Sequence, residues 1–168
     1  MATKDESTNV QHGHPEQHVV IFQLEDEYYG LDIQAVQEIV RMQSITTIPG
    51  ADDWVKGITN LRGRVVPVID LRRRCGMPSV EPTAATRIVV VTAADGMVGL
   101  IVDAVSEVMR IPGEQVEPPS LIVSAPENAY LRGIAKLPDR LVSLLDLEGV
   151  LPSRVVVDTE TAETLAAA

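Results

Sequence analysis

The sequence predicts a mainly-β fold of two similar lobes, each a small closed barrel of about five short strands, with only short helices. Three observations lead to this prediction. Apolar residues gather in short runs rich in Val, Ile and Leu, which suit strands better than helices. Aromatic residues make up only 3% of the chain, so aliphatic side chains must build the core. The runs recur in the same order in two parts of the chain, with Gly and Pro turns between them.

The internal repeat has two matching segments. Residues 29–41 (YGLDIQAVQEIVR) and 98–110 (VGLIVDAVSEVMR) are identical at six of thirteen positions. Residues 57–71 (GITNLRGRVVPVIDL) and 133–147 (GIAKLPDRLVSLLDL) are identical at seven of fifteen. Average residue usage predicts roughly one chance identity per fifteen to twenty positions, so coincidence explains the match poorly. Two copies are too few for a solenoid and indicate two similar lobes.

Strands are expected at residues 19–24 and 88–93, each followed by a short turn that contains an Asp. Residues 36–42 and 105–111 are ambiguous, because their apolar spacing fits a short helix almost as well as a strand. Their β-branched content favours the strand.

The repeat and the turn-rich stretches also predict the domain boundaries. Residues 76–85 (GMPSVEPTAA) are the expected linker between the lobes. The predicted organisation is a disordered polar tail at 1–17, a folded domain at 18–152 with lobes at about 18–80 and 86–150, and a C-terminal tail at 153–168.

Composition excludes several classes of function. The net charge of −10 argues against nucleic-acid binding and against adhesion to an anionic membrane. No apolar stretch is long enough for a membrane span, and the polar N-terminus lacks the apolar core of a signal peptide. The single cysteine, Cys75, rules out a disulfide within the chain and fits a reducing compartment. We therefore expect a cytoplasmic protein.

Catalytic chemistry has little support in the sequence. The three histidines, His12, His14 and His18, all lie in the N-terminal segment, where a metal site is conceivable but a disordered polar tail is favoured. Without a histidine in the folded body, Ser-His or Cys-His nucleophilic chemistry has no base. No phosphate-binding glycine loop occurs. We predict no catalysis, no cofactor and no metal.

Two other reactive residue types have ordinary explanations. Asp70 and Asp146 occupy equivalent repeat positions just before a Leu, where a carboxylate caps a short helix, and we favour capping over an acid–base pair between lobes. Cys75 follows three arginines that could lower its pKa, but we favour a passive, partly buried thiol.

A local cluster of positive charge stands out in this acidic chain. It comprises Lys56, Arg62, Arg64, Arg72, Arg73 and Arg74. Arginines pair directionally with carboxylates, so the cluster is either a partner surface or an ordinary solvated rim. The repeat favours a specialised role for its centre, because residues 60–63 (NLRG) become KLPD in the second copy.

Residues 55–71 (VKGITNLRGRVVPVIDL) closely resemble the signature stretch of the CheW family. The resemblance extends over about residues 18–152, through segments such as YYGLDIQAVQEIVRM and YLRGIAKLPDRLVSLLDL. It implies two SH3-like five-stranded barrels around a shared apolar core, and a non-catalytic adaptor. Proteins of this kind bind the cytoplasmic tips of methyl-accepting chemotaxis receptors and the regulatory domain of the histidine kinase CheA. The resemblance further implies receptor arrays beneath the inner membrane, with CheW–CheW contacts in rings.

The resemblance also implies functional positions. The receptor-facing candidates are Val36, Glu38, Gly57, Arg62 and Val108. Glu38 and Arg62 are expected to pair across a groove, which would suit a helical partner. Core packing is an equal explanation for Val36 and Val108, and backbone geometry alone would explain Gly57. Val116 and Ile122 are the candidate kinase contacts.

Three alternatives remain open at this stage. An adaptor of a chemosensory pathway that does not control motility would have the same sequence features. A small-barrel nucleic-acid binder is disfavoured by the scarcity of aromatic rings for base stacking and by the negative charge. An enzyme is disfavoured by the lack of a histidine in the body and of a phosphate loop.

Overall fold

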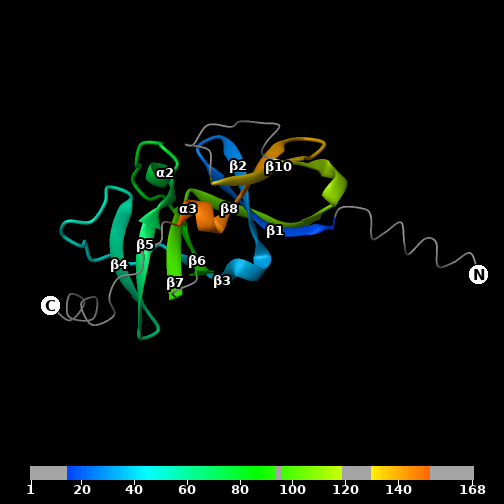
Figure 1. Ribbon diagram of the computed structural model, residues 1–168. Helices are drawn as coiled ribbons and strands as arrows, with labels where there is room; N and C mark the ends of the chain where they lie inside the picture. The colour runs from blue at the N-terminus through cyan, green and yellow to red at the C-terminus, as the bar shows by residue number, and fades with distance from the viewer. Residues whose placement is uncertain (1–14, 94–95, 119–129, 152–168) are drawn as a thin grey trace, which may run out of the picture.

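The computed structural model describes residues 15–93, 96–118 and 130–151, and these residues form two β-sheets that lie side by side (Figure 1). The first half of the chain supplies β1 (Gln17–Leu24), β2 (Glu27–Asp32), β3 (Val36–Arg41), β4 (Val55–Leu61) and β5 (Arg64–Asp70). The second half supplies β6 (Arg87–Ala93), β7 (Gly96–Val102), β8 (Ala104–Ile111), β9 (Val116–Glu117), β10 (Leu131–Lys136) and β11 (Leu141–Leu145). The short helices are η1 (Ile33–Ala35), α2 (Leu71–Arg74), η2 (Gly113–Gln115) and α3 (Leu147–Val150). The mainly-β prediction is confirmed.

The structural repeat follows the sequence repeat. β2 and β3 in the first half correspond to β7 and β8 in the second, and β4, β5 and α2 correspond to β10, β11 and α3. The two ambiguous segments are strands, β3 and β8, as their β-branched residues favoured. At the predicted boundaries, Gln17 already belongs to β1, while residues 1–14 and 152–168 lie outside the described residues.

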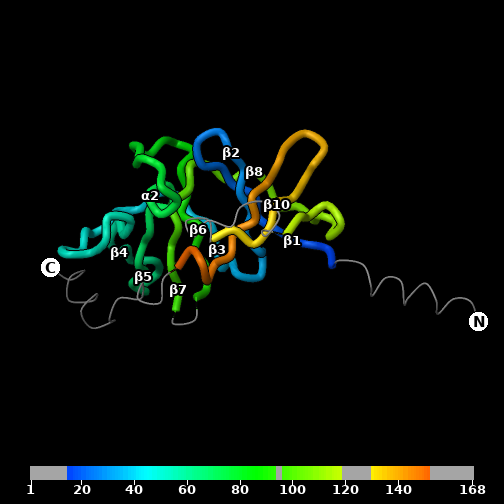
Figure 2. The backbone as a smooth tube through the Cα atoms, turned by 45° about the horizontal axis from the view of Figure 1, so that its top comes forward, coloured from blue at the N-terminus to red at the C-terminus, as the bar shows by residue number. Residues whose placement is uncertain are grey.

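Each sheet is built from both halves of the chain. The six-stranded sheet has the order β8-β1-β2-β11-β10-β9, and the five-stranded sheet has the order β3-β6-β7-β5-β4. The hairpin β1–β2 is thus inserted among second-half strands, and the hairpin β6–β7 among first-half strands. In Figure 2 the blue β1–β2 hairpin lies beside the orange strand β11, which pairs in parallel with β2. The predicted lobes at 18–80 and 86–150 therefore do not coincide with the two sheets, because a sequence repeat shows which segments are alike but not which strands pair.

The two sheets close in the same way. Thr46 forms an antiparallel bridge with Ile58 of β4, with N–H···O distances of 2.8 and 2.9 Å in the two directions. At the equivalent position of the other lobe, Glu117 of β9 pairs with Ile134 of β10. The sixth strand is therefore the counterpart of the Thr46 bridge, and both lobes follow one five-strand plan. We call them the five-stranded lobe and the six-stranded lobe.

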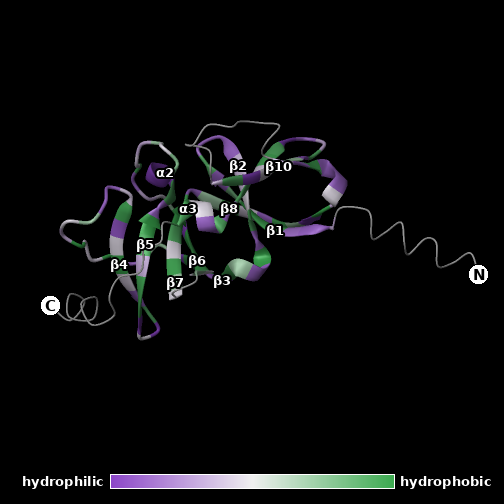
Figure 3. Ribbon diagram, viewed as in Figure 1, coloured by the Kyte–Doolittle hydropathy of each residue, from purple (hydrophilic) through white to green (hydrophobic). Residues whose placement is uncertain are grey.

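Among the described residues, buried apolar side chains form three clusters. The largest lies between the sheets and takes residues from both exchanged hairpins and both α-helices, including Phe22, Leu31, Leu71, Leu100 and Val150. A second cluster fills the six-stranded lobe around Ile21, Ile111 and Leu144, and a third fills the five-stranded lobe around Val66, Ile88 and Val90. In Figure 3 hydrophobic colour runs along β5 and β7. The shared core that the family resemblance implied is present.

The two short α-helices begin at the predicted caps. The Asp70 carboxylate accepts from the backbone N–H of Arg72 at 3.1 Å, and that of Asp146 accepts from the backbone N–H of Glu148 at 3.2 Å. These contacts satisfy N–H groups that a helix start leaves without partners. Within the described residues, no helix has the length and apolar character needed to cross a membrane.

Candidate protein-interaction site

The predicted pair of Glu38 and Arg62 is present at one end of the five-stranded lobe. Arg62 Nη1 lies 3.0 Å from Glu38 Oε1, and the Arg62 side chain is 80% exposed whereas that of Glu38 is 25% exposed. Glu38 comes from β3 and Arg62 from the turn between β4 and β5. The pair therefore links a strand to a hairpin tip and leaves the guanidinium facing solvent.

The hairpin turn explains how Arg62 reaches this position. Arg62 and Gly63 are the two central residues of the β4–β5 hairpin turn, with φ of 54° and 84°. Positive φ at both positions is characteristic of a type I′ turn. Such a φ is uncommon for a residue with a side chain. The Gly63 N–H donates to Asn60 Oδ1 at 2.9 Å and holds the turn. The NLRG sequence at 60–63 thus builds a turn that projects one arginine from the end of the lobe.

An open depression lies beside the pair. It has a volume of about 300 Å³ and is lined by Gln37, Glu38, Leu61, Arg62, Arg64 and Met97. Leu61 and Met97 also pack on the interior of the lobe. The lining of the depression therefore combines two apolar side chains, Leu61 and Met97, with polar and charged ones, a mixture that a surface binding one face of an amphipathic helix can use.

Gly57 has a backbone role. Its φ is +149°, and a Cβ built on it would lie 2.1 Å from the carbonyl oxygen of Thr46. Any side chain at this position would push apart the Thr46–Ile58 bridge that closes the lobe. Gly57 is buried, so it acts by shaping β4 and not as an exposed contact.

The two candidate valines differ in exposure. Val36 begins β3 and is half-buried against the shared core. Val108 is 48% exposed on β8, where it pairs with Val20 of β1. Val108 therefore lies in the other sheet from Glu38 and Arg62. The structure joins Glu38 and Arg62 and leaves Val108 as a separate exposed apolar position.

The two candidate kinase contacts have different outcomes. Val116 belongs to β9, pairs with Ala135 of β10 and is half-buried against the interior of the six-stranded lobe. Ile122 lies outside the described residues.

The equivalent end of the six-stranded lobe holds another ion pair. Arg140 pairs with Glu107, and its guanidinium carbon lies 4.6 Å from the centre of the Tyr28 ring. Glu107 is the repeat counterpart of Glu38, and Arg140 is the counterpart of Arg64. This pair was not predicted, and the repeat alone does not reveal it, because in the five-stranded lobe Glu38 pairs with Arg62 instead of with Arg64.

Comparison with known proteins identifies the family. The CheW-like domain matches residues 18–155 of the chain. Chemotaxis protein CheW of Klebsiella aerogenes is 38% identical over 137 residues, which is 82% of either chain. Chemotaxis protein CheW of Rhizobium meliloti is 35% identical over 135 residues, 80% of this chain and 87% of its own. The crystal structure of scaffolding protein TtCheW from Thermoanaerobacter tengcongensis has a TM-score of 0.77 at 36% identity, over 85% of this chain and 99% of its own. The chain belongs to the CheW family.

CheW-family membership makes this chain a non-catalytic scaffold of chemotaxis signalling, as the sequence predicted. A scaffold binds its partners through its surface, so only those cationic side chains of the cluster that face solvent can contact a partner. Arg62, Arg64 and Arg73 are exposed, and Arg73 pairs with the exposed Asp53 at 3.4 Å. Lys56 is also exposed.

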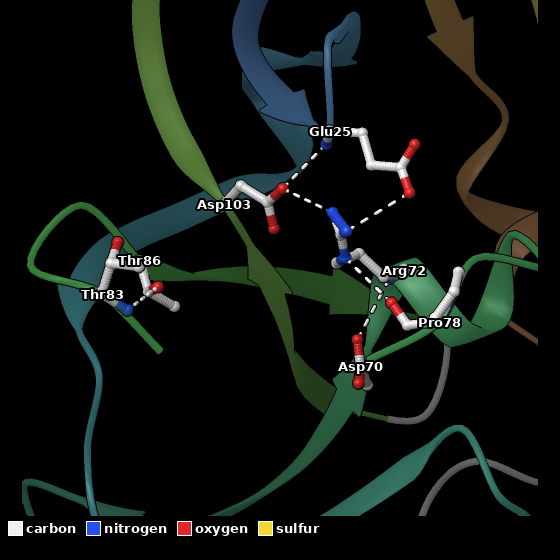
Figure 4. Close-up of polar contacts among 7 residues, drawn as sticks. All are labelled: Glu25, Asp70, Arg72, Pro78, Thr83, Thr86 and Asp103. Carbon is white, nitrogen blue, oxygen red and sulfur yellow. Dashed lines mark hydrogen bonds and ion pairs between the residues drawn. The ribbon is translucent and has the colours of Figure 1, made fainter. Parts of the chain in front are cut away.

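Arg72 is buried, and Arg74 is half-buried. Arg72 is 8% exposed and contacts Asp103 at 2.8 Å, Glu25 at 3.3 Å and the Pro78 carbonyl at 3.0 Å (Figure 4). Arg74 donates to the carbonyls of Val150 and Gly149 at 2.7 and 3.3 Å, and its guanidinium lies over Trp54. The cluster is therefore not one partner surface. Adjacent arginines in the sequence point to different surroundings once α2 packs against the second half of the chain.

Cys75 and the three histidines are the remaining reactive groups that the sequence singled out. Cys75 is partly buried against the shared core, and burial raises the pKa of its thiol to about 11 although the nearby Arg74 lowers it. The thiol is therefore protonated at neutral pH and is a poor nucleophile. In the part of the chain that the structure describes, no group of three or more His, Cys, Asp or Glu side chains is arranged to hold a metal. His18 is exposed on β1, and His12 and His14 lie outside the described residues.

Proposed function

We propose that this CheW-family chain couples the cytoplasmic tips of methyl-accepting chemotaxis receptors to the regulatory domain of CheA, at receptor arrays beneath the inner membrane. The observation that carries the proposal is the Glu38–Arg62 pair, with Arg62 facing solvent, beside an open depression that Leu61 and Met97 also line. A receptor tip is a helical hairpin, and a depression that offers both apolar and charged side chains suits one face of a helix.

The receptor surface has two parts. Glu38 and Arg62 supply its polar part, where Arg62 pairs with a receptor carboxylate or Glu38 with a receptor cation. Val108 supplies an apolar contact from β8. Val36 and Gly57 contribute indirectly, because Val36 seats β3 on the core and Gly57 closes the lobe beside the hairpin.

The kinase surface is assigned to the six-stranded lobe around β9. Val116 lies there, and Ile122 follows in the same connection to β10. Contacts between copies of the chain are proposed to complete rings, in which one lobe of a molecule meets the other lobe of its neighbour, since a heterologous contact between unlike surfaces can close a ring.

The test is binding to a receptor-tip helical hairpin and, separately, to a CheA regulatory domain. Arg62→Glu places two carboxylates together and is expected to weaken receptor binding about tenfold or more while kinase binding persists. The matched control is Arg73→Glu, which changes an exposed arginine in a different pair and is expected to leave both affinities within about twofold. The double variant Glu38→Arg/Arg62→Glu restores the pair in reverse. Its recovery of receptor binding would indicate that the pair holds the rim in shape, whereas continued loss would indicate direct recognition of the arginine.

Val108 is tested against Leu141, another exposed apolar residue of the same sheet. Val108→Asp is expected to weaken receptor binding, whereas Leu141→Asp is not, although Leu141 is 61% exposed on the same sheet. Equal losses from the two variants would contradict the assignment of Val108. If neither wild-type interaction is detected, the coupling role itself is wrong.

A further inference from the structure

The two halves of the chain are joined by strand pairing in both sheets. β1 pairs with β8 along the register from Gln17↔Ile111 to Gln23↔Ala104, and β3 pairs with β6 from Val36↔Val91 to Arg41↔Arg87. β2 pairs in parallel with β11, and β5 pairs in parallel with β7. Each half therefore places its first hairpin, β1–β2 or β6–β7, in the sheet whose other strands come from the opposite half.

The shared apolar core is also built from side chains of both halves. The shared cluster combines Phe22 and Leu31 from the first hairpin with Leu100 and Val102 from the second, and all four are at most 1% exposed. A half on its own would lose its opposite hairpin and expose the apolar face of every strand that packs against it. Loss of this burial removes the main favourable term for folding either half alone.

Polar contacts also connect the halves. Arg72 of the first half pairs with Asp103 of the second, whose carboxylate additionally accepts from the Glu25 N–H at 2.8 Å (Figure 4). Arg132 of the second half donates to Gln17 at 2.8 Å. These contacts fix how the two halves align, and separating the halves removes Asp103 from the buried Arg72, which is costly for a buried charge.

The segment that connects the two halves supplies no strand to either sheet. It runs from α2 to β6, and residues 78–85 are exposed. Its first part is fixed to the first half, because Pro78 accepts from Arg72 and Ser79 donates to Asp70. Its last part is fixed near β6, where the Thr83 N–H donates to Thr86. Between these anchors, Val80 to Pro82 can be cut without removing a strand pairing.

We propose that the two halves, divided between Val80 and Glu81, bind each other as separate chains, that the complex re-forms both sheets, and that neither half forms its sheet alone. The partner that fits the surface exposed by a separated half is thus the complementary half. This inference concerns the interface inside the molecule and does not depend on which receptor or kinase the assembled scaffold binds.

The first experiment uses the full chain with a protease site inserted between Val80 and Glu81 and cut after folding. The expected product elutes in gel filtration as one species with the mass of the intact chain, and its circular dichroism spectrum and cooperative unfolding resemble those of the uncut chain. Separation of the two fragments under native conditions would overturn the proposal.

The second experiment separates the fragments of the cut chain in denaturant and refolds them apart and together. The mixture is expected to give a one-to-one complex with the native spectrum, while each fragment alone lacks a cooperative unfolding transition. A fragment that unfolds cooperatively as a monomer would show that one half is an independent domain, contrary to the proposal.

Substitutions of the neighbouring Arg72 and Arg73 compare an arginine that contacts the other half with one that does not. Arg72→Gln removes a contact between the halves, whereas Arg73→Gln removes only an exposed pair with Asp53 inside the first half. In the cut chain, Arg72→Gln is expected to raise the dissociation constant between fragments about tenfold or more, and Arg73→Gln to change it less than about twofold. Equal effects of the two variants would contradict the assigned role of Arg72.

Discussion

The ends of the two lobes have the same origin in the repeat but different surfaces. At the end of the six-stranded lobe, Arg140 pairs with Glu107 and covers the Tyr28 ring, and its side chain is only 17% exposed. At the end of the five-stranded lobe the matching arginine, Arg64, is exposed, and Glu38 pairs instead with Arg62 at the hairpin tip.

The difference follows from a few residues. The tyrosine that supports Arg140 is replaced by Met97 at the equivalent position, so Arg64 has no ring to cover. The hairpin tip reads Arg62-Gly63 in one lobe and Pro138-Asp139 in the other, so only one lobe projects an arginine there. The same barrel frame thus gives one end closed by its own side chains and one end open to a partner.

The largest difference between the lobes is expected from the glycines beside each closing segment. Gly57→Ala is expected to cost about 3–5 kcal/mol, because the added Cβ meets the Thr46 carbonyl at 2.1 Å and the φ of +149° disfavours any side chain. At the equivalent Gly133, a Cβ would lie 3.0 Å from the Glu117 carbonyl oxygen without a positive φ, so Gly133→Ala is expected to cost about 1–2 kcal/mol. Urea denaturation of both variants measures the difference. Equal losses would show that the two closures are not distinguished by backbone conformation.

The next effect compares the matching arginines. Arg140→Ala is expected to lower the free energy of unfolding by about 1–2 kcal/mol, because it removes a charge-assisted hydrogen bond and a cation–π contact from a partly buried site. Arg64→Ala is expected to change it by less than about 0.5 kcal/mol, as is usual for an exposed side chain. Chemical denaturation tests both, and a destabilising Arg64→Ala would mean that the five-stranded end is closed in solution as well.

Arg62→Ala is expected to affect receptor binding much more than folding stability. Since its side chain is 80% exposed, Arg62→Ala is expected to change the free energy of unfolding by less than about 1 kcal/mol. Under the proposed function it nevertheless weakens receptor binding about tenfold. Thermal unfolding and a binding titration on the same preparation distinguish the two effects, and loss of both together would assign Arg62 to the structure of the hairpin.

Much of this arrangement could be predicted from the sequence, and the part that could not has a physical reason. The strands, the repeat, the Asp70 and Asp146 caps and the Glu38–Arg62 pair depend on local patterns or on residues carried over from a resemblance. The exchange of hairpins could not be predicted, because a repeat is compatible with pairing inside a copy or between copies. Arg72 and Arg73 show the same limit at the level of side chains. They are neighbours of one type, yet one is buried by Asp103 and Glu25 and the other is exposed, since the contacts come from strands distant in the chain.

A small gain in stability is expected if the open end of the five-stranded lobe is closed by its own side chains. Met97→Tyr would place beside Arg64 the ring that Tyr28 places beside Arg140, so Arg64 could cover it and approach Glu38 as Arg140 approaches Glu107. A cation–π contact at a partly exposed site contributes about 0.5–1 kcal/mol, so a rise in the unfolding free energy of that size is expected. Receptor binding should fall at the same time, because the ring and Arg64 would fill the depression. Adding Arg64→Ala to Met97→Tyr is expected to abolish the gain in stability. If Met97→Tyr stabilises the protein equally with and without Arg64, the ring acts through burial alone, and the difference between the lobe ends does not rest on the arginine.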